Sequence, residues 1–197
     1  MGSPGSYRWR EWLVLAGAPV NVLLAWACGH LDTGLGNDGR WLLDWGIGAF
    51  YGVGVLLPLG WYRSQPWVRS LFAVAVSIFA WHWAARLAAD SYSALGENQL
   101  TFVTRSAVSG FFGAVVTGGV PLARSCFPGW ERRLPIAGLV GGLCGAQMAL
   151  LCLWNFGLGF WLGVIGWQVA VTAVYLYATA PQHGGHLRFW PAPPHLS

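Results

Sequence analysis

The chain contains no lysine, and all of its positively charged side chains are arginines. A Schiff base with retinal or pyridoxal phosphate needs a lysine amine, and a P-loop uses a lysine to hold its phosphates. The absence of lysine therefore excludes a retinal or pyridoxal protein and a chain that hydrolyses ATP through a P-loop of its own.

Motifs of other chemistry are missing as well. No G-x-S-x-G or H-E-x-x-H spacing occurs, so the sequence contains no recognisable nucleophile or zinc-protease motif. The four cysteines, Cys28, Cys126, Cys144 and Cys152, include no C-x-x-C pair. Cys144 and Cys152 lie too far apart on one predicted helix to form a disulfide. We interpret the cysteines as small apolar packing residues, and an enzyme is the least favoured class of protein.

Charged residues are scarce. Only 9% of the residues are charged, whereas 55% are hydrophobic. A soluble domain needs more polar surface, because about 25% of the residues are charged in typical soluble proteins. The composition therefore predicts an integral membrane protein.

Six apolar stretches are each long enough to cross a hydrocarbon core of about 30 Å, which takes about 20 helical residues. They cover residues 12–31, 41–62, 68–89, 102–123, 134–154 and a last stretch that ends near Thr179. The sequence thus predicts an all-α bundle of six transmembrane helices over residues 12–179, between a segment 1–11 and a tail 180–197. Only Asn155 and nearby glycines separate the last two stretches, which predicts an antiparallel hairpin.

The distribution of arginines predicts the orientation, because cytoplasmic loops are enriched in positive charge. With the N-terminus inside, most arginines lie on the cytoplasmic side, and only Arg40, Arg86 and Arg105 lie on the outer side. Both termini are then cytoplasmic. We expect a protein of a bacterial inner membrane whose positive charge serves orientation and contact with anionic lipid, and not nucleic-acid binding.

Glycines recur at four-residue spacing within the predicted helices, which lets helix backbones approach closely in a bilayer. The pairs are Gly48 and Gly52, Gly138 and Gly142, and Gly159 and Gly163. We expect them to pack helices in a compact bundle or homo-oligomer, and the alternative is that they let a helix break beside a solute site. Segments 44–48 and 155–159 also share a polar, aromatic, Gly, aliphatic, Gly pattern. This match predicts three helical hairpins related by a parallel repeat.

Ionisable groups inside membrane helices are costly, so each one is a candidate functional residue. His82, Arg86 and Asp90 follow one another at four-residue steps on one face of the third helix. Under the predicted topology, the polar residues converge near the outer ends of the helices. The candidate pore or substrate-binding group is Asp44, His82, Arg86, Asp90, Arg105 and Asn155. The alternative is a network of ion pairs that only ties the helices together.

No cofactor or metal is predicted, although three weaker patterns leave alternatives open. His30 and His82 could share a depth on different helices, as two axial ligands of a haem would. The tail histidines His183, His186 and His195 could bind a metal, but they lack acidic neighbours. Several of the fourteen tryptophans fall near span centres, where they could pack against glycines or contact a flat ligand such as a quinone or pigment.

Two functions remain. The first is a small-solute channel or transporter in which the six candidate residues line an outward-facing polar cavity, with His82 as a group that titrates near neutral pH. The second is a non-catalytic accessory subunit of a larger membrane complex that binds partner helices, lipid or pigment. A polar cavity that reaches past the membrane midplane would favour the first function. A dry interior with large apolar faces would favour the second.

Overall fold

Nearly every described residue of this chain is helical. The computed structural model describes residues 8–31, 45–62, 67–93, 98–119 and 130–179, and within these ranges only Asn98 and Asn155 lie outside helices. A bilayer provides no water to hydrogen-bond exposed backbone groups, so an apolar chain of this kind must satisfy them within helices. The predicted all-α fold is confirmed for the described residues.

The helical segments agree with the predicted spans to within a few residues. They are α1 (Arg8–Leu31), a second segment made of α3 (Ile47–Tyr51), η3 (Gly52–Leu56) and α4 (Leu57–Tyr62), then α5 (Trp67–Ser93), α6 (Gln99–Gly119), α7 (Trp130–Trp154) and α8 (Phe156–Thr179). Four of them, α5 to α8, are long and apolar enough to cross a membrane, while α1 and the second segment contain shorter apolar stretches. The orientation and the parallel repeat stay predictions.

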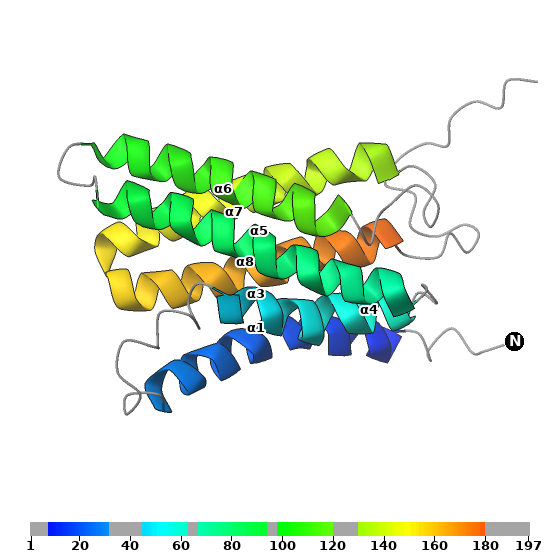
Figure 1. Ribbon diagram of the computed structural model, residues 1–197. Helices are drawn as coiled ribbons and strands as arrows, with labels where there is room; N and C mark the ends of the chain where they lie inside the picture. The colour runs from blue at the N-terminus through cyan, green and yellow to red at the C-terminus, as the bar shows by residue number, and fades with distance from the viewer. Residues whose placement is uncertain (1–7, 32–44, 63–66, 94–97, 120–129, 180–197) are drawn as a thin grey trace, which may run out of the picture.

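The helices lie side by side and contact one another in chain order (Figure 1). α5 contacts α6, α6 contacts α7, and α7 contacts α8. α8 then contacts α1, α1 contacts α3, and α3 contacts α5, which closes the arrangement into a ring. The end of α5, the start of α6 and the junction of α7 with α8 lie at the same end of the bundle, on the left in Figure 1.

The second segment is interrupted by the π-helix η3. Gly54 of η3 faces α1, where a methyl group on its Cα would lie 2.5 Å from Asn21 Nδ2. The Asn21 side chain is buried, and its Nδ2 has no hydrogen-bond partner among the described residues. The Asn21 side chain therefore lies directly against the backbone of η3.

Glycines provide close contacts between neighbouring helices. A methyl group on Gly48 would lie 2.6 Å from Trp81 Cβ, and one on Gly52 would lie 2.9 Å from Val74 Cα, both on α5. Contacts with a neighbouring helix are found for all six predicted packing positions: Gly48 and Gly52 against α5, Gly138 and Gly142 against α6, and Gly159 and Gly163 against α7. The tightest approach of α6 to α7 joins the backbones of Gly110, Gly141 and Gly145.

Gly141→Ala is expected to destabilise the bundle by about 1–3 kcal/mol, the usual cost of adding a methyl group to a closely packed interface. The added methyl group would lie 2.6 Å from Ala114 Cβ and 3.2 Å from the Gly110 carbonyl carbon. Gly166→Ala is the matched control, because no described atom lies within 4 Å of its added methyl group. Thermal unfolding in detergent gives the unfolding midpoints of both variants. Equal midpoints would contradict the close contact between α6 and α7.

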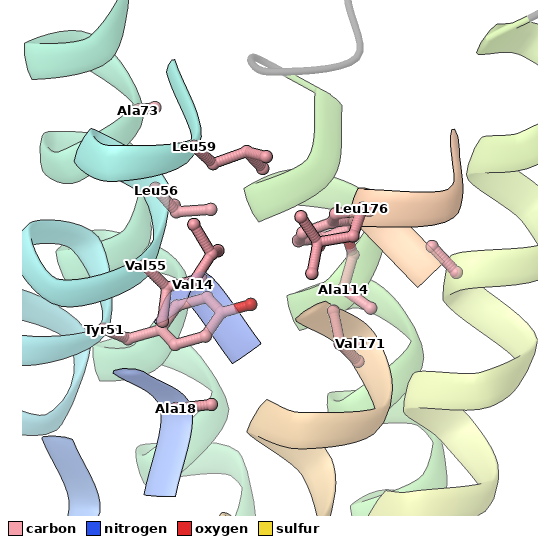
Figure 2. Packing of buried hydrophobic residues seen from close by; sticks show 12 residues of the cluster. Val14, Ala18, Tyr51, Val55, Leu56, Leu59, Ala73, Ala114, Val171 and Leu176 are labelled. Carbon is pink, nitrogen blue, oxygen red and sulfur yellow. The ribbon is translucent and has the colours of Figure 1, made fainter. Parts of the chain in front are cut away.

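Buried apolar side chains from several helices form a common cluster in the interior of the ring. One cluster includes Val14 of α1, Leu59 of the second segment, Ala114 of α6 and Val171 of α8. Figure 2 shows Tyr51 of α3 pointing across this cluster towards the helices that carry Ala114 and Val171. The cluster therefore holds α3, α6 and α8 in fixed positions around the interior.

Candidate functional site

The helices of the ring line a partly open cavity of about 430 Å³. Volumes of about 300–1,000 Å³ are typical of sites that bind small molecules. The wall consists mostly of apolar and aromatic side chains with a few hydroxyl and amide groups, and no charged residue of the described chain lines it. The cavity thus has the composition of a small-molecule site whose ligand is largely apolar.

One face of each contributing helix forms the wall. On α6 the lining residues follow helical spacing of three or four, with Phe102 at one end and Thr117 at the other. The residues between them are Ser106, Ser109, Gly110 and Gly113. Because these residues are small, α6 leaves space where a helix with larger side chains would fill the interior.

Most hydroxyl groups in the wall are already paired. Ser77 Oγ donates to the Gly48 carbonyl oxygen at 2.8 Å, and Ser109 Oγ donates to the Ala84 carbonyl oxygen at 3.1 Å. Trp167 Nε1 donates to the Gly110 carbonyl oxygen at 3.2 Å. These bonds also connect α5 to α3, α5 to α6, and α8 to α6.

Two lining groups are buried and have no such partner. Ser106 and Gln168 are each 1% exposed. Ser106 Oγ and Gln168 Oε1 have no hydrogen-bond partner among the described residues, and both residues belong to the cavity wall. A buried polar atom without a partner costs about 1–3 kcal/mol. Both atoms have almost no accessible surface, so they lie within the helix packing behind the cavity wall.

Two residues of the cavity wall, Tyr51 and Thr117, hydrogen-bond to residues of α8 behind the wall. Tyr51 Oη hydrogen-bonds to Thr172 Oγ1 at 3.0 Å, which joins α3 to α8. Thr117 Oγ1 and Tyr175 Oη form a hydrogen bond of 2.7 Å, which joins α6 to α8. Each hydroxyl has one proton, so one of the pair donates to the other, and the second donates to a carbonyl oxygen of α6, that of Gly113 for Thr117 or that of Ala114 for Tyr175. We call these four residues, Tyr51, Thr117, Thr172 and Tyr175, the tyrosine floor.

The opposite end of the cavity is more exposed. Phe156 and Gly157, at the start of α8, line the cavity, and both are exposed. Under the predicted topology this end faces the outer side of the membrane. The cavity is therefore lined by exposed residues at the start of α8 and by buried residues at Tyr51 and Thr117.

The predicted polar group occupies other positions. His82 is half-buried and stacks on Trp45, with ring centroids 3.8 Å apart and an angle of 12° between the ring planes. Its Nδ1 has no hydrogen-bond partner among the described residues. His82 does not line the cavity, and its ring contacts are those of an aromatic packing residue.

The charged candidates lie on the surface of the bundle. Arg86, Asp90 and Arg105 have exposed side chains, and none of them lines the cavity. Asp44 and the tail histidines lie outside the described residues, and the surroundings of the His30 side chain are likewise not described. The role of the charged candidates as a solute site stays a prediction.

Asn155 caps α8. Its Oδ1 accepts a hydrogen bond from the backbone N–H of Leu158 at 3.1 Å, three residues along, as an N-cap side chain does. Its side chain is exposed and does not line the cavity. The geometry thus explains this residue as a cap on the helix that follows.

Asn155→Ala is expected to destabilise the α7–α8 hairpin by about 1 kcal/mol, because one helical N–H loses its acceptor. Asn155→Asp keeps an acceptor at the same position, so its unfolding midpoint should stay close to that of the wild type. Thermal unfolding in detergent provides the comparison. A loss of stability in Asn155→Asp as large as that in Asn155→Ala would contradict the capping role.

The described residues contain no group of three or more side chains suited to hold a metal ion. Cys144 and Cys152 are free thiols, and Cys152 lines the cavity. The two cysteines do not bond to each other, as their spacing predicts. Haem ligation by His30 and His82 stays an untested alternative.

Sequence reasoning missed the polar groups that line the cavity. Charged residues were the candidates, because burying a charge in a membrane costs free energy. Ser106, Thr117 and Gln168 resemble ordinary helix-packing residues in the sequence. A signal was present in the helical spacing of serine, glycine and threonine along α6. Such a stripe is equally compatible with a close helix contact, so the neighbouring helices had to be placed before it could be assigned to a cavity.

Comparisons with models of protein families, with curated proteins and with solved structures give no match to this chain. The inference about function therefore starts from the cavity and its lining residues.

Proposed function

We propose that this protein is a non-catalytic membrane protein that holds a lipid-like molecule inside its helix ring. The observation that carries the proposal is the partly open cavity of about 430 Å³ with an apolar and aromatic wall. A charged or strongly polar solute would lose its hydration in such a wall without compensating partners, which costs several kcal/mol. An apolar molecule loses nothing of this kind and gains contact with the wall.

Holding a molecule fits an apolar cavity better than transporting one. A largely apolar molecule already dissolves in the hydrocarbon core, so it needs no protein to cross it. What a protein can add is a defined position, a defined orientation and separation from the bulk lipid. This is the role of an accessory subunit that binds lipid or pigment, the second function predicted from the sequence.

Native mass spectrometry tests the proposal. The protein is extracted from its own membrane in a mild detergent, and bound molecules are released from the intact chain by collision. The proposal predicts one bound molecule of defined mass per chain. Recovery of the bare chain alone, under conditions that preserve bound lipid on a control membrane protein, would contradict it.

A transporter is the second candidate, and the tyrosine floor is the observation that favours it. A cavity lined by exposed residues at one end and by buried, hydrogen-bonded residues at the other resembles one state of an alternating-access cycle. Thr117→Cys, in a variant without the native cysteines, distinguishes the two functions. A transporter would expose this cysteine to a water-soluble thiol reagent from the floor side during turnover, whereas a holding protein would keep it protected.

A further inference from the structure

We propose that the molecule held in the cavity carries an uncharged, flat ring system, aromatic or conjugated, that stacks on the indole of Trp167. This inference rests on the proposed function, because it specifies the molecule that the helix ring holds. Its starting point is the position of Trp167 in the cavity wall, where the side chain is half-buried and contacts two other helices, α6 and α3.

Contacts with α6 and α3 fix the orientation of the Trp167 ring. Its Nε1 donates to the Gly110 carbonyl oxygen at 3.2 Å. A methyl group on Gly113 would lie 3.4 Å from Trp167 Cζ2, so one edge of the indole lies along these two glycines of α6. Tyr51 makes an edge contact with the ring, and its own hydroxyl is hydrogen-bonded to Thr172. The indole therefore has little freedom to turn, and a ligand that binds it loses little side-chain entropy.

The protein does not use the indole of Trp167 for stacking. Elsewhere in the bundle, Trp45 and His82 stack with an angle of 12° between their ring planes. Among the described residues, the ring contact of Trp167 is with Tyr51, whose ring is inclined by 61° with centroids 5.9 Å apart. Since one edge of the indole lies on α6 and the side chain borders the cavity, a stacking partner has to come from the cavity.

Space remains beside this ring. Trp167 Cζ2 is the only described atom within 4 Å of a methyl group built on Gly113, although Gly113 itself lines the cavity. Three further aromatic side chains of the wall, Trp81, Phe160 and Trp161, are half-buried and also border the cavity. A flat ligand on Trp167 can therefore contact other rings as well.

The chemistry of an indole selects the ligand. Two aromatic rings in an offset stack attract each other more strongly than their buried area alone explains, whereas a saturated chain gains only from the buried area. A cation is also attracted to the face of an indole. In a wall without a charged residue among the described ones, however, a cation would lose more in hydration than this attraction returns. An uncharged flat ring is the group that gains most.

Equilibrium dialysis in detergent micelles tests the inference. The full-length protein is first washed until native mass spectrometry detects only the bare chain. The probes are radiolabelled 2-methylnaphthalene and 2-methyldecalin, which share one carbon skeleton, but only the first is flat and aromatic. Bound probe is the excess over protein-free micelles. The ratio of bound naphthalene to bound decalin is compared between variants, so that the different solubility of the probes in detergent cancels.

Trp167→Leu should lower this ratio by about fivefold, which corresponds to about 1 kcal/mol for one lost ring stack. Trp167→Phe keeps a smaller ring, so the ratio should fall only by about twofold. Trp83→Leu is the matched control, because this indole is 71% exposed and does not line the cavity. Its ratio should match that of the wild type. Thermal unfolding verifies that the variants are folded, and Trp167→Phe alone decides the test if Trp167→Leu does not fold.

Two results overturn the inference in different ways. If both probes bind but the ratio is the same in the wild type and in the Trp167 variants, the stacking site is disproved and the holding function is left intact. If neither probe binds to the wild type in excess of protein-free micelles, the holding function is disproved together with it.

Discussion

Gly113→Leu is expected to abolish ligand binding while leaving the protein at least as stable as the wild type. Gly113 lies in the cavity wall. The only described atom within 4 Å of a methyl group at this position is Trp167 Cζ2, at 3.4 Å. A leucine side chain would therefore extend into the space that the ligand occupies. Bound molecule, measured by native mass spectrometry, should fall by at least about tenfold, since the loss of a buried chain contact exceeds 1.4 kcal/mol.

The stability of Gly113→Leu separates this effect from misfolding. Leucine is a better helix former than glycine by nearly 1 kcal/mol, and filling an apolar cavity adds to stability. Gly166→Leu is the matched control, because it places the same side chain on a helix where no described atom lies within 4 Å of the first added carbon. The control should retain the bound molecule. Full occupancy in Gly113→Leu would show that the ligand binds elsewhere.

Tyr175→Ala should destabilise the bundle by about 3–5 kcal/mol, the cost of removing a large buried ring. Tyr175 is 0% exposed, and its hydroxyl bonds to Thr117 and to the Ala114 carbonyl oxygen. Its ring also packs against Gly118, where an added methyl group would lie 2.6 Å from Tyr175 Cε1. Removal of the side chain therefore breaks the tyrosine floor and leaves a void between α6 and α8.

Two further tyrosine variants resolve this effect into ring and hydroxyl contributions. Tyr175→Phe keeps the ring, so it should cost only about 1 kcal/mol for the lost hydrogen bonds. Tyr177→Ala removes an exposed ring that lies 5.9 Å from the Arg133 guanidinium, and it should cost about 1 kcal/mol or less. Unfolding in mixed detergent micelles measures the free energy of unfolding of all three variants. Similar losses for Tyr175→Ala and Tyr177→Ala would contradict the role of the floor.

The membrane helices were predictable because the hydrocarbon core of a bilayer restricts the backbone conformations that a chain can adopt. An apolar stretch of about 20 residues that crosses a bilayer must be helical there. The interruption of the second segment was not predictable in the same way. Gly54 of the interruption lies against Asn21 of another helix, and a contact between two helices cannot be derived from the residues near Gly54 in the sequence.

The candidate site could be predicted only in outline. The sequence indicates which polar residues lie inside the membrane and are therefore candidate functional residues. It does not show which of them face the interior of the bundle. Arg86 and Arg105 are exposed on the bundle surface, whereas Ser106, one residue after Arg105, is buried in the cavity wall. The rotation of α6 about its axis decides between these outcomes. That rotation follows from the packing of Gly110 against Gly141 and Gly145.

The most direct test is a structure of the wild-type protein crystallised from a lipid mesophase, at a resolution that reveals bound lipid. We expect one continuous density for a largely apolar molecule inside the helix ring, in contact with the cavity wall. An interior closed by side chains, or one that contains only separate water molecules, would contradict the holding function.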